Sequence, residues 1–169
     1  MFDATFVVLG ILTGSAFVGG AQLEVILGTL VAACLAMSIS TGVSVYEAEM
    51  IESEIQLRRI ERAMLTPLRD THPDKELRFM RSTVSLVNAA APLVVLLVTS
   101  SPLLLFRIGV VGDLTSAAWM SVFAAVGIVF GAGFYLGRIT RTGAVKKGIR
   151  MVVIAVATFL ALTLLEKYI

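Results

Sequence analysis

The chain has 169 residues, of which 57% are hydrophobic and 15% are charged, and its mean hydropathy is +0.92. A soluble domain carries about 25% charged residues, so this composition excludes an ordinary soluble protein and indicates an integral membrane protein. The net charge of +2 is too small to indicate a nucleic-acid partner. At this length a single transmembrane domain covering residues 1–169 is expected.

Five uncharged stretches, expected as helices, follow one another at residues 4–23, 25–46, 82–106, 114–137 and 151–165. The first four contain 20 or more residues, which is enough to cross the hydrocarbon core as helices. The fifth has only 15, but the basic residues Lys146, Lys147 and Arg150 precede it and can extend to the interface. The sequence therefore predicts an all-α integral membrane protein with five transmembrane helices.

The second stretch continues into a charged segment that keeps a helical pattern. Residues 47–65 contain Glu47, Glu49, Glu52, Glu54, Arg58, Arg59, Glu61 and Arg62. No Pro or Gly follows Gly42 until Pro67, so helix two is expected to extend into the cytoplasm. Residues 47–81 then form a cytoplasmic helical insertion between helices two and three. After the break at Thr66–Pro67, a second short helix beginning near Pro73 is expected to lead into helix three.

Basic residues predict the orientation. Seven lie in residues 47–81 and five lie between helices four and five, whereas the opposite side carries only Arg107 and Lys167. The positive-inside rule therefore predicts a multi-pass protein of the cell membrane, with a cytoplasmic N-terminus and an external C-terminus.

The charged extension carries two superimposed patterns. Met50, Leu57, Ile60 and Met64 follow a 3–4 heptad spacing, with Ser53 at the remaining core position, which is typical of a short coiled coil or an antiparallel packing surface. Glu47, Glu54 and Glu61 recur every seven residues along its flank. Their carboxylates, with the softer thioether of Met50, are candidate ligands for a divalent metal. The alternative is a solvated face, in which Glu54 pairs with Arg58 and the charges keep the helix soluble.

Polar residues inside the membrane helices are candidates for an ion path. Met37 lies in the middle of helix two beside Ser38 and Thr41, and this polar stretch either lines a path or forms hydrogen bonds across helices. Asn88, one turn before Pro92, either faces the path or bonds a carbonyl that the proline frees. Asp3 and Glu24 lie at helix ends, as interfacial anchors or as guards of an ion path.

The four glycines of helix four form two pairs with three intervening residues. These pairs are Gly127 with Gly131 and Gly133 with Gly137, a spacing that allows close helix packing. The sequence contains no nucleophile–base pair, no Cys/His metal cluster and no phosphate-binding loop. No enzymatic activity and no cofactor are therefore predicted.

Several short motifs follow one another in a fixed order along the chain. They are the opening Phe2-Asp3-Ala4 with the glycine-rich first helix, the Ser- and Met-containing stretch from Ala36 to Ser44, and Gly133 to Arg138 with Lys147 to Met151. This ordered set resembles the vacuolar iron transporter family in a short prokaryotic-type form. It covers nearly the whole chain. Two departures are Ala4 in place of the family's glycine and a second alignment register that puts Thr41 at the position of the family's methionine.

The resemblance implies a homodimer that exports Fe²⁺, Mn²⁺ or a related divalent metal from the cytosol with proton exchange. By the same resemblance, Asp3 and Met37 would bind metal along the membrane path, and Glu47, Glu54 and Glu61 would collect it in the cytoplasm. The metal is the substrate in this interpretation, not a resident cofactor. The alternative hypothesis is a non-transporting membrane scaffold whose cytoplasmic helical segment binds a partner.

Overall fold

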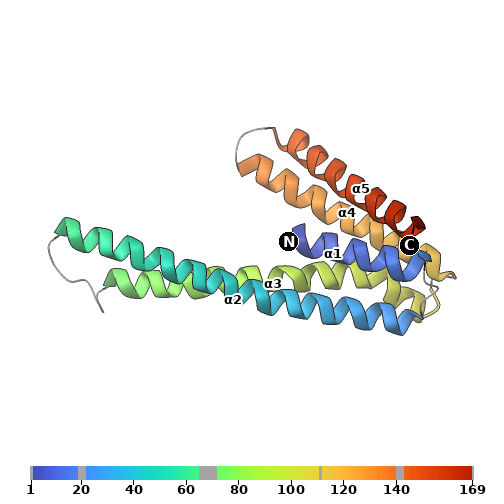
Figure 1. Ribbon diagram of the computed structural model, residues 1–169, viewed down its shortest axis with the longest axis horizontal. Helices are drawn as coiled ribbons and strands as arrows, with labels where there is room; N and C mark the ends of the chain where they lie inside the picture. Colours follow the sequence, from blue (N-terminus) through green and yellow to red (C-terminus); the bar gives the residue numbers. More distant parts are fainter. Residues whose placement is uncertain (1, 19–21, 65–71, 111, 140–142, 169) are drawn as a thin grey trace. The chain divides into compact units, whose positions relative to one another are not determined.

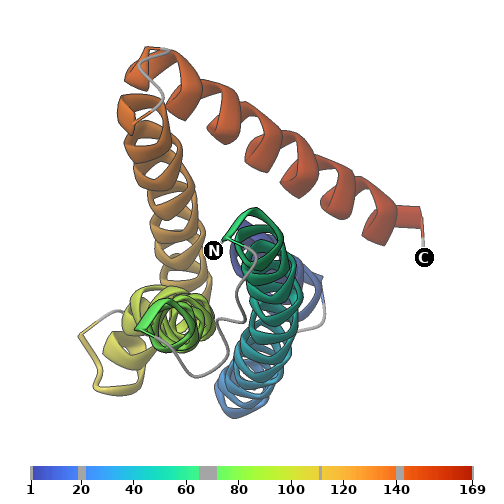
Figure 2. The same ribbon diagram turned by 90° about the vertical axis from the view of Figure 1, so that its left-hand side faces the viewer.

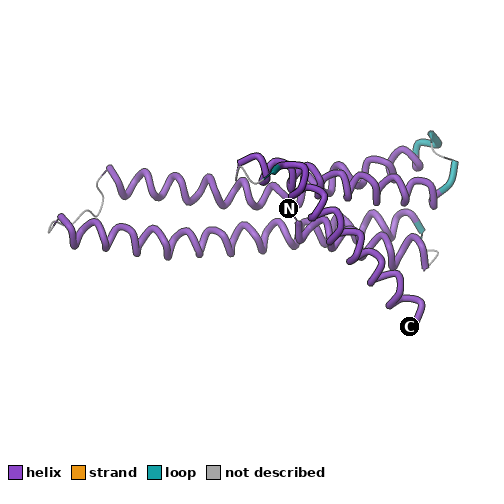
Figure 3. Tube along the Cα trace, turned by 90° about the horizontal axis from the view of Figure 1, so that it is seen from above, coloured by secondary structure: helices purple, strands orange, loops and turns teal. Residues whose placement is uncertain are grey.

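The computed structural model describes residues 2–18, 22–64, 72–110, 112–139 and 143–168, and within these ranges it contains helices and no strand (Figure 3). The elements are α1 (Phe2–Leu12), a π-helix η1 (Thr13–Val18), α2 (Leu23–Met64), α3 (His72–Arg107), α4 (Leu114–Ile139) and α5 (Ala144–Tyr168) (Figure 1). The side chains of residues 16–18, 72–77 and 165–168 are not described. The all-α prediction is confirmed for the described part of the chain.

Four of the described helices are long and apolar enough to cross a membrane. These candidates, by length and composition, are Leu23–Met64, Arg78–Arg107, Leu114–Ile139 and Ala144–Leu164. These lengths meet the need of a hydrocarbon core about 30 Å thick for about 20 helical residues. The helices therefore indicate a multi-pass membrane protein.

The first and fifth expected helices differ from their uncharged stretches. The fifth stretch looked short, but α5 begins at Ala144 and so includes the basic residues before Met151. Helix α1 ends at Leu12 and passes directly into η1, and the apolar helical segment Phe2–Ser15, which includes the start of η1, is shorter than the four candidate spans. The length of an uncharged run does not give the length of the helix, because a helix can continue through charged residues whose side chains reach the interface.

The extension of helix two is confirmed as continuous helix. Helix α2 runs for 42 residues from Leu23 to Met64 without interruption. The expected separate short helix after Pro73 is wrong, since α3 is one helix of 36 residues that begins at His72. Pro73 occupies its first turn, where a missing amide hydrogen removes no intrahelical hydrogen bond. The expected break at Thr66–Pro67 lies outside the described residues.

The chain divides into two compact units. Unit 1 comprises Met1–Leu35 and Pro92–Ile169, and unit 2 comprises Ala36–Ala91. Helices α2 and α3 contribute to both units. Each unit is described below by itself.

In unit 1, α4 and α5 form a tightly packed hairpin whose glycines permit the contact. A methyl group added at Gly137 would lie 2.7 Å from the Cα atom of Ala144, and one added at Gly133 would lie 3.1 Å from the Cα atom of Gly148. Figure 2 shows the two helices meeting at the end where they are joined. The expected packing role is therefore confirmed for Gly133 and Gly137. Nothing lies within 4 Å of a methyl group added at Gly127 or Gly131.

The core of unit 1 is apolar and is formed by every helix of the unit. Its largest fully buried side chains include Leu9, Leu12, Ile26, Leu30, Val95, Leu103 and Val129. At one end, the exposed side chains of Arg107 on α3 and Glu24 on α2 form an ion pair of 3.9 Å. Glu24 is thus placed beside the end of α3.

In unit 2, α2 and α3 run antiparallel and pack through small residues. The Ser38 hydroxyl donates a hydrogen bond to the carbonyl of Ala89 (2.5 Å), and the Ser85 hydroxyl donates one to the carbonyl of Gly42 (2.7 Å). A methyl group added at Gly42 would lie 3.0 Å from the Cβ atom of Ala89. One further turn along each helix, the guanidinium of Arg81 lies 5.0 Å from the ring centroid of Tyr46. The pairing register is therefore fixed over this part of unit 2.

Candidate functional site

The predicted polar path in helix two is partly used for helix packing. Ser38 is 8% exposed, and its hydroxyl is bonded to α3, which is the cross-helix role that its sequence context allowed. Thr41 and Met37 are half-buried on the same helix. The side chain of Met37, a predicted metal ligand, is therefore partly accessible in unit 2. Its thioether sulfur is a soft donor atom.

Asn88 is exposed, and its side-chain amide donates to the carbonyl of Val84 at 2.9 Å. Pro92 removes the amide hydrogen that would bond the carbonyl of Asn88 itself, four residues earlier. The side chain of Asn88 therefore does not satisfy the carbonyl freed by the proline. Its own carboxamide oxygen remains a hydrogen-bond acceptor on the exposed face of α3.

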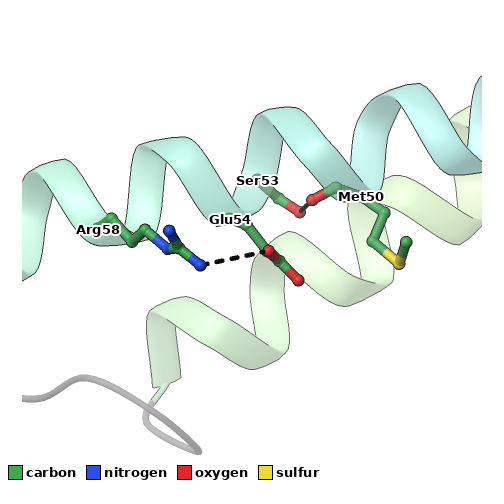
Figure 4. Close-up of polar contacts among 4 residues, drawn as sticks. All are labelled: Met50, Ser53, Glu54 and Arg58. Atoms are coloured by element: carbon green, nitrogen blue, oxygen red, sulfur yellow. Dashed lines mark hydrogen bonds and ion pairs between the residues drawn. The ribbon is translucent and has the colours of Figure 1, made fainter.

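The acidic extension presents its carboxylates mainly to solvent. Glu47 and Glu54 are exposed and Glu61 is half-buried. The carboxylate of Glu54 lies 4.0 Å from the guanidinium of Arg58, which confirms the expected pair four residues apart (Figure 4). Both partners are more than half exposed, with side-chain exposures of 64% and 72%, so this pair contributes little to stability.

The three glutamates do not converge on one ion. Residues seven apart on a helix lie about 10.5 Å apart along its axis, whereas the oxygen ligands of a divalent cation lie about 2–2.6 Å from it. Within the described residues, no group of three or more His, Cys, Asp or Glu side chains could hold a metal ion. The geometry therefore gives a row of separate negative charges along α2, not a closed metal site.

The predicted hydrophobic seam of the extension is half-buried only over its first part. Met50, Ser53 and Leu57 are half-buried, whereas Ile60 and Met64 are exposed by 40% and 61%. The Ser53 hydroxyl donates to the carbonyl of Met50 at 2.9 Å, within the same helix (Figure 4). Met50 is half-buried, and because it follows Glu47 by three residues and precedes Glu54 by four, it lies on the same side of the helix as these exposed carboxylates.

Asp3 lies in unit 1, in the first turn of α1, and is exposed. A carboxylate there is favourably placed relative to the helix dipole, which agrees with a helix-start role. The residues that follow it, Ala4 and Thr5, are completely buried. Asp3 is therefore an exposed charge directly at the edge of the apolar core of unit 1.

Sequence reasoning missed a set of buried hydroxyl groups in unit 1. Thr5, Thr13, Thr99 and Ser121 are all completely buried. The hydroxyl of Thr13 donates to the carbonyl of Leu9 at 2.6 Å, and that of Ser121 donates to the carbonyl of Ala117 at 3.1 Å. Thr13 also begins the π-helix, a distortion that often occurs at functional sites. Their only sequence signal was a Ser or Thr inside an apolar run, which is common in membrane helices.

Comparison with known proteins places no further constraint on the site. No family model matches the chain, and no curated protein or solved structure matches it.

Proposed function

We propose that this protein is a transporter that moves a divalent transition metal, Fe²⁺ or Mn²⁺, out of the cytosol. The observation that carries this proposal is the continuity of α2, which joins a membrane span containing Met37 to an exposed acidic extension. In this proposal one continuous helix links the acidic extension, which attracts the cation, to Met37, which binds it. The resemblance to the vacuolar iron transporter family agrees with this use.

The charge order along the extension suits cation capture. Residues 47–57 contain four glutamates and no Lys or Arg, and the first arginine of α2 is Arg58. The negative charges of α2 itself are therefore concentrated in the first part of the extension, and Arg81 of α3 lies beside the start of this part at Tyr46. Such a field raises the local concentration of a divalent cation and its rate of arrival.

Inside the membrane, we propose that Asp3 and Met37 bind the ion one after the other. The exposed carboxylate of Asp3 favours any divalent cation, and the half-buried thioether of Met37 favours a transition metal. The hydroxyl of Thr41 and the amide of Asn88 are the remaining polar candidates for the path. Exchange against protons is part of the proposal and follows from the family resemblance.

The proposed arrangement is a homodimer of five-helix protomers with cytoplasmic N-termini. The twelve basic residues on one side of the predicted topology, against two on the other, support this orientation. The dimer is part of the proposal and follows from the family resemblance.

The experiment that tests transport is metal flux into proteoliposomes containing the purified full chain. Fe²⁺, Mn²⁺ and Mg²⁺ entry should be followed with an internal metal-sensitive dye, with and without an imposed proton gradient. We expect Fe²⁺ and Mn²⁺ flux above that of protein-free liposomes, accelerated by the gradient. Flux equal to that of protein-free liposomes for every ion would reject the transporter function.

A second candidate function is a membrane scaffold, and the exposed apolar side chains of the extension favour it. Ile51 and Ile55, one turn apart on α2, are exposed by 58% and 47% among charged neighbours. A partner helix would cover such a pair. Absence of metal flux together with loss of a membrane-bound complex in Ile51→Ser/Ile55→Ser would support this function over transport.

A further inference from the structure

The joined end of the α4–α5 hairpin carries a concentration of positive charge. Residues 114–165 contain five basic residues and no Asp or Glu. Three of the five, Arg138 in the last turns of α4 and Lys146 and Arg150 in the first turns of α5, are exposed in the described structure. Any acidic counterpart must therefore come from outside residues 114–165.

Glycine packing brings these three cations to one end of the hairpin. Gly137 precedes Arg138 and approaches Ala144 so closely that an added methyl group would lie 2.7 Å from the Cα atom of Ala144. The same methyl group would lie 3.1 Å from the Cβ atom of Lys147, whose aliphatic stem therefore packs against α4. The start of α5 is thus held against the end of α4, and mutual repulsion of the cations does not separate the helices.

An exposed apolar stripe continues from these cations along α5. Lys146 and Arg150 are one turn apart on one face, and Val153, Leu160 and Leu164 follow with exposures of 61%, 55% and 60%. From Val153 to Leu164 the helix rises about 16 Å. This length matches about 15 Å for the hydrocarbon of one bilayer leaflet.

We propose that this surface binds an anionic phospholipid. The phosphate of the head group is held by Arg138, Lys146 and Arg150, and an acyl chain lies along Val153, Leu160 and Leu164. Charge complementarity identifies the head group, because phosphate oxygens accept paired hydrogen bonds from arginine and neutralise cations that have no Asp or Glu within residues 114–165. The adjoining stripe identifies the lipid as the source of that phosphate, since a free phosphate ion would leave the stripe unused.

The test uses tryptophan quenching by brominated lipids in the full chain. Trp119 is replaced by Phe, and Val153→Trp supplies a reporter on the stripe. The reporter chain is reconstituted in phosphatidylcholine with either brominated phosphatidylglycerol or brominated phosphatidylcholine. We expect stronger quenching by phosphatidylglycerol, and a preference that falls about fivefold for each cation removed. Arg138→Gln/Lys146→Gln/Arg150→Gln should therefore abolish the preference.

The control is Arg58→Gln/Arg59→Gln/Arg62→Gln, which removes the same charge from α2 and should leave the preference unchanged. Equal quenching by the two lipids in the reporter chain overturns the proposal, and this measurement does not depend on whether the triple variant folds. An equal loss of the phosphatidylglycerol preference in the two triple variants also overturns the proposal, since the preference would then depend only on the net charge of the protein. Abolition of the preference by inorganic phosphate would assign the cations to a free anion and would also overturn it.

Discussion

Arg81 on α3 stacks over Tyr46 on α2, with its guanidinium carbon 5.0 Å from the ring centroid. Tyr46 is the last residue of the uncharged stretch 25–46, and Arg81 immediately precedes the uncharged stretch 82–106. The two stretches therefore end side by side in unit 2. Tyr and Arg are both favoured at a membrane–water interface, so this contact marks the level at which α2 and α3 leave the proposed membrane.

The first prediction concerns topology. In a Cys34→Ser background, single Arg58→Cys and Asp113→Cys variants should label from opposite sides of the membrane. The reason is that Arg58 lies on the extension beyond Tyr46, whereas Asp113 lies in the connection between α3 and α4, at the other end of the span. Labelling of intact cells and inverted vesicles with a membrane-impermeant maleimide measures this. Labelling of both positions from one side would contradict the proposed spans.

The second prediction concerns the α2–α3 contact. Gly42→Ala should destabilise the protein by about 1–3 kcal/mol, because the new methyl group would meet the Cβ atom of Ala89 at 3.0 Å and two hydrogen bonds hold the helices together. Thermal unfolding in detergent measures this loss of stability. Gly28→Ala is the matched control, since nothing lies within 4 Å of a methyl group there. Ala89→Gly combined with Gly42→Ala should restore most of the loss, and a failure to do so would place the strain elsewhere.

The third prediction concerns the α4–α5 hairpin. Gly137→Ala should lower the melting temperature, with a free-energy loss of about 1–3 kcal/mol or more, because the methyl group would lie 2.7 Å from main-chain Ala144 Cα. A main-chain atom cannot turn aside as a flexible side chain can. Gly131→Ala on the same helix has open space and should be neutral or slightly stabilising through helix propensity. Equal melting temperatures for the two variants would show that the hairpin is not packed through Gly137.

The fourth prediction concerns the acidic extension. Glu47→Gln/Glu54→Gln should raise the metal concentration for half-maximal flux about tenfold and leave the maximal flux unchanged, because it weakens attraction and not translocation. Arg58→Gln should act in the opposite direction, since it removes the cation 4.0 Å from Glu54. Both effects should fade at high ionic strength, where exposed charges are screened. A fall in maximal flux with unchanged half-saturation would instead place these glutamates in the translocation path.

The fifth prediction separates the two proposed membrane ligands. Asp3→Asn removes a charge and should lower the flux of Fe²⁺, Mn²⁺ and Mg²⁺ alike. Met37→Ala removes a soft donor and should lower Fe²⁺ flux more than Mg²⁺ flux, by about tenfold or more, since even outer-shell changes at metal sites cost 10–100-fold. Met37→Leu is the shape control and should behave like Met37→Ala if the sulfur is the ligand. Wild-type flux in both Asp3→Asn and Met37→Ala would eliminate this assignment.

The sequence by itself determined the class of the molecule and the course of its second helix. Long uncharged runs are enough to predict membrane helices. An unpaired backbone amide or carbonyl is too costly in lipid, and a helix pairs these groups within the segment itself. The same local argument identified the continuation of α2 to Met64, since no Pro or Gly interrupts it. It also predicted the Glu54–Arg58 pair, which depends only on helix periodicity.

Only the tertiary structure decided which polar and small residues face a neighbouring helix. Ser38 and Thr41 look alike in the sequence, but only contact with α3 shows that the Ser38 hydroxyl bonds Ala89. Gly131 and Gly137 likewise look alike, yet only Gly137 meets another backbone. Helix periodicity places residues on a face of their own helix, whereas the rotation of that face toward a partner depends on packing between distant segments. The same reason explains why Glu47, Glu54 and Glu61, regular in sequence, form a row of separate charges and not one metal site.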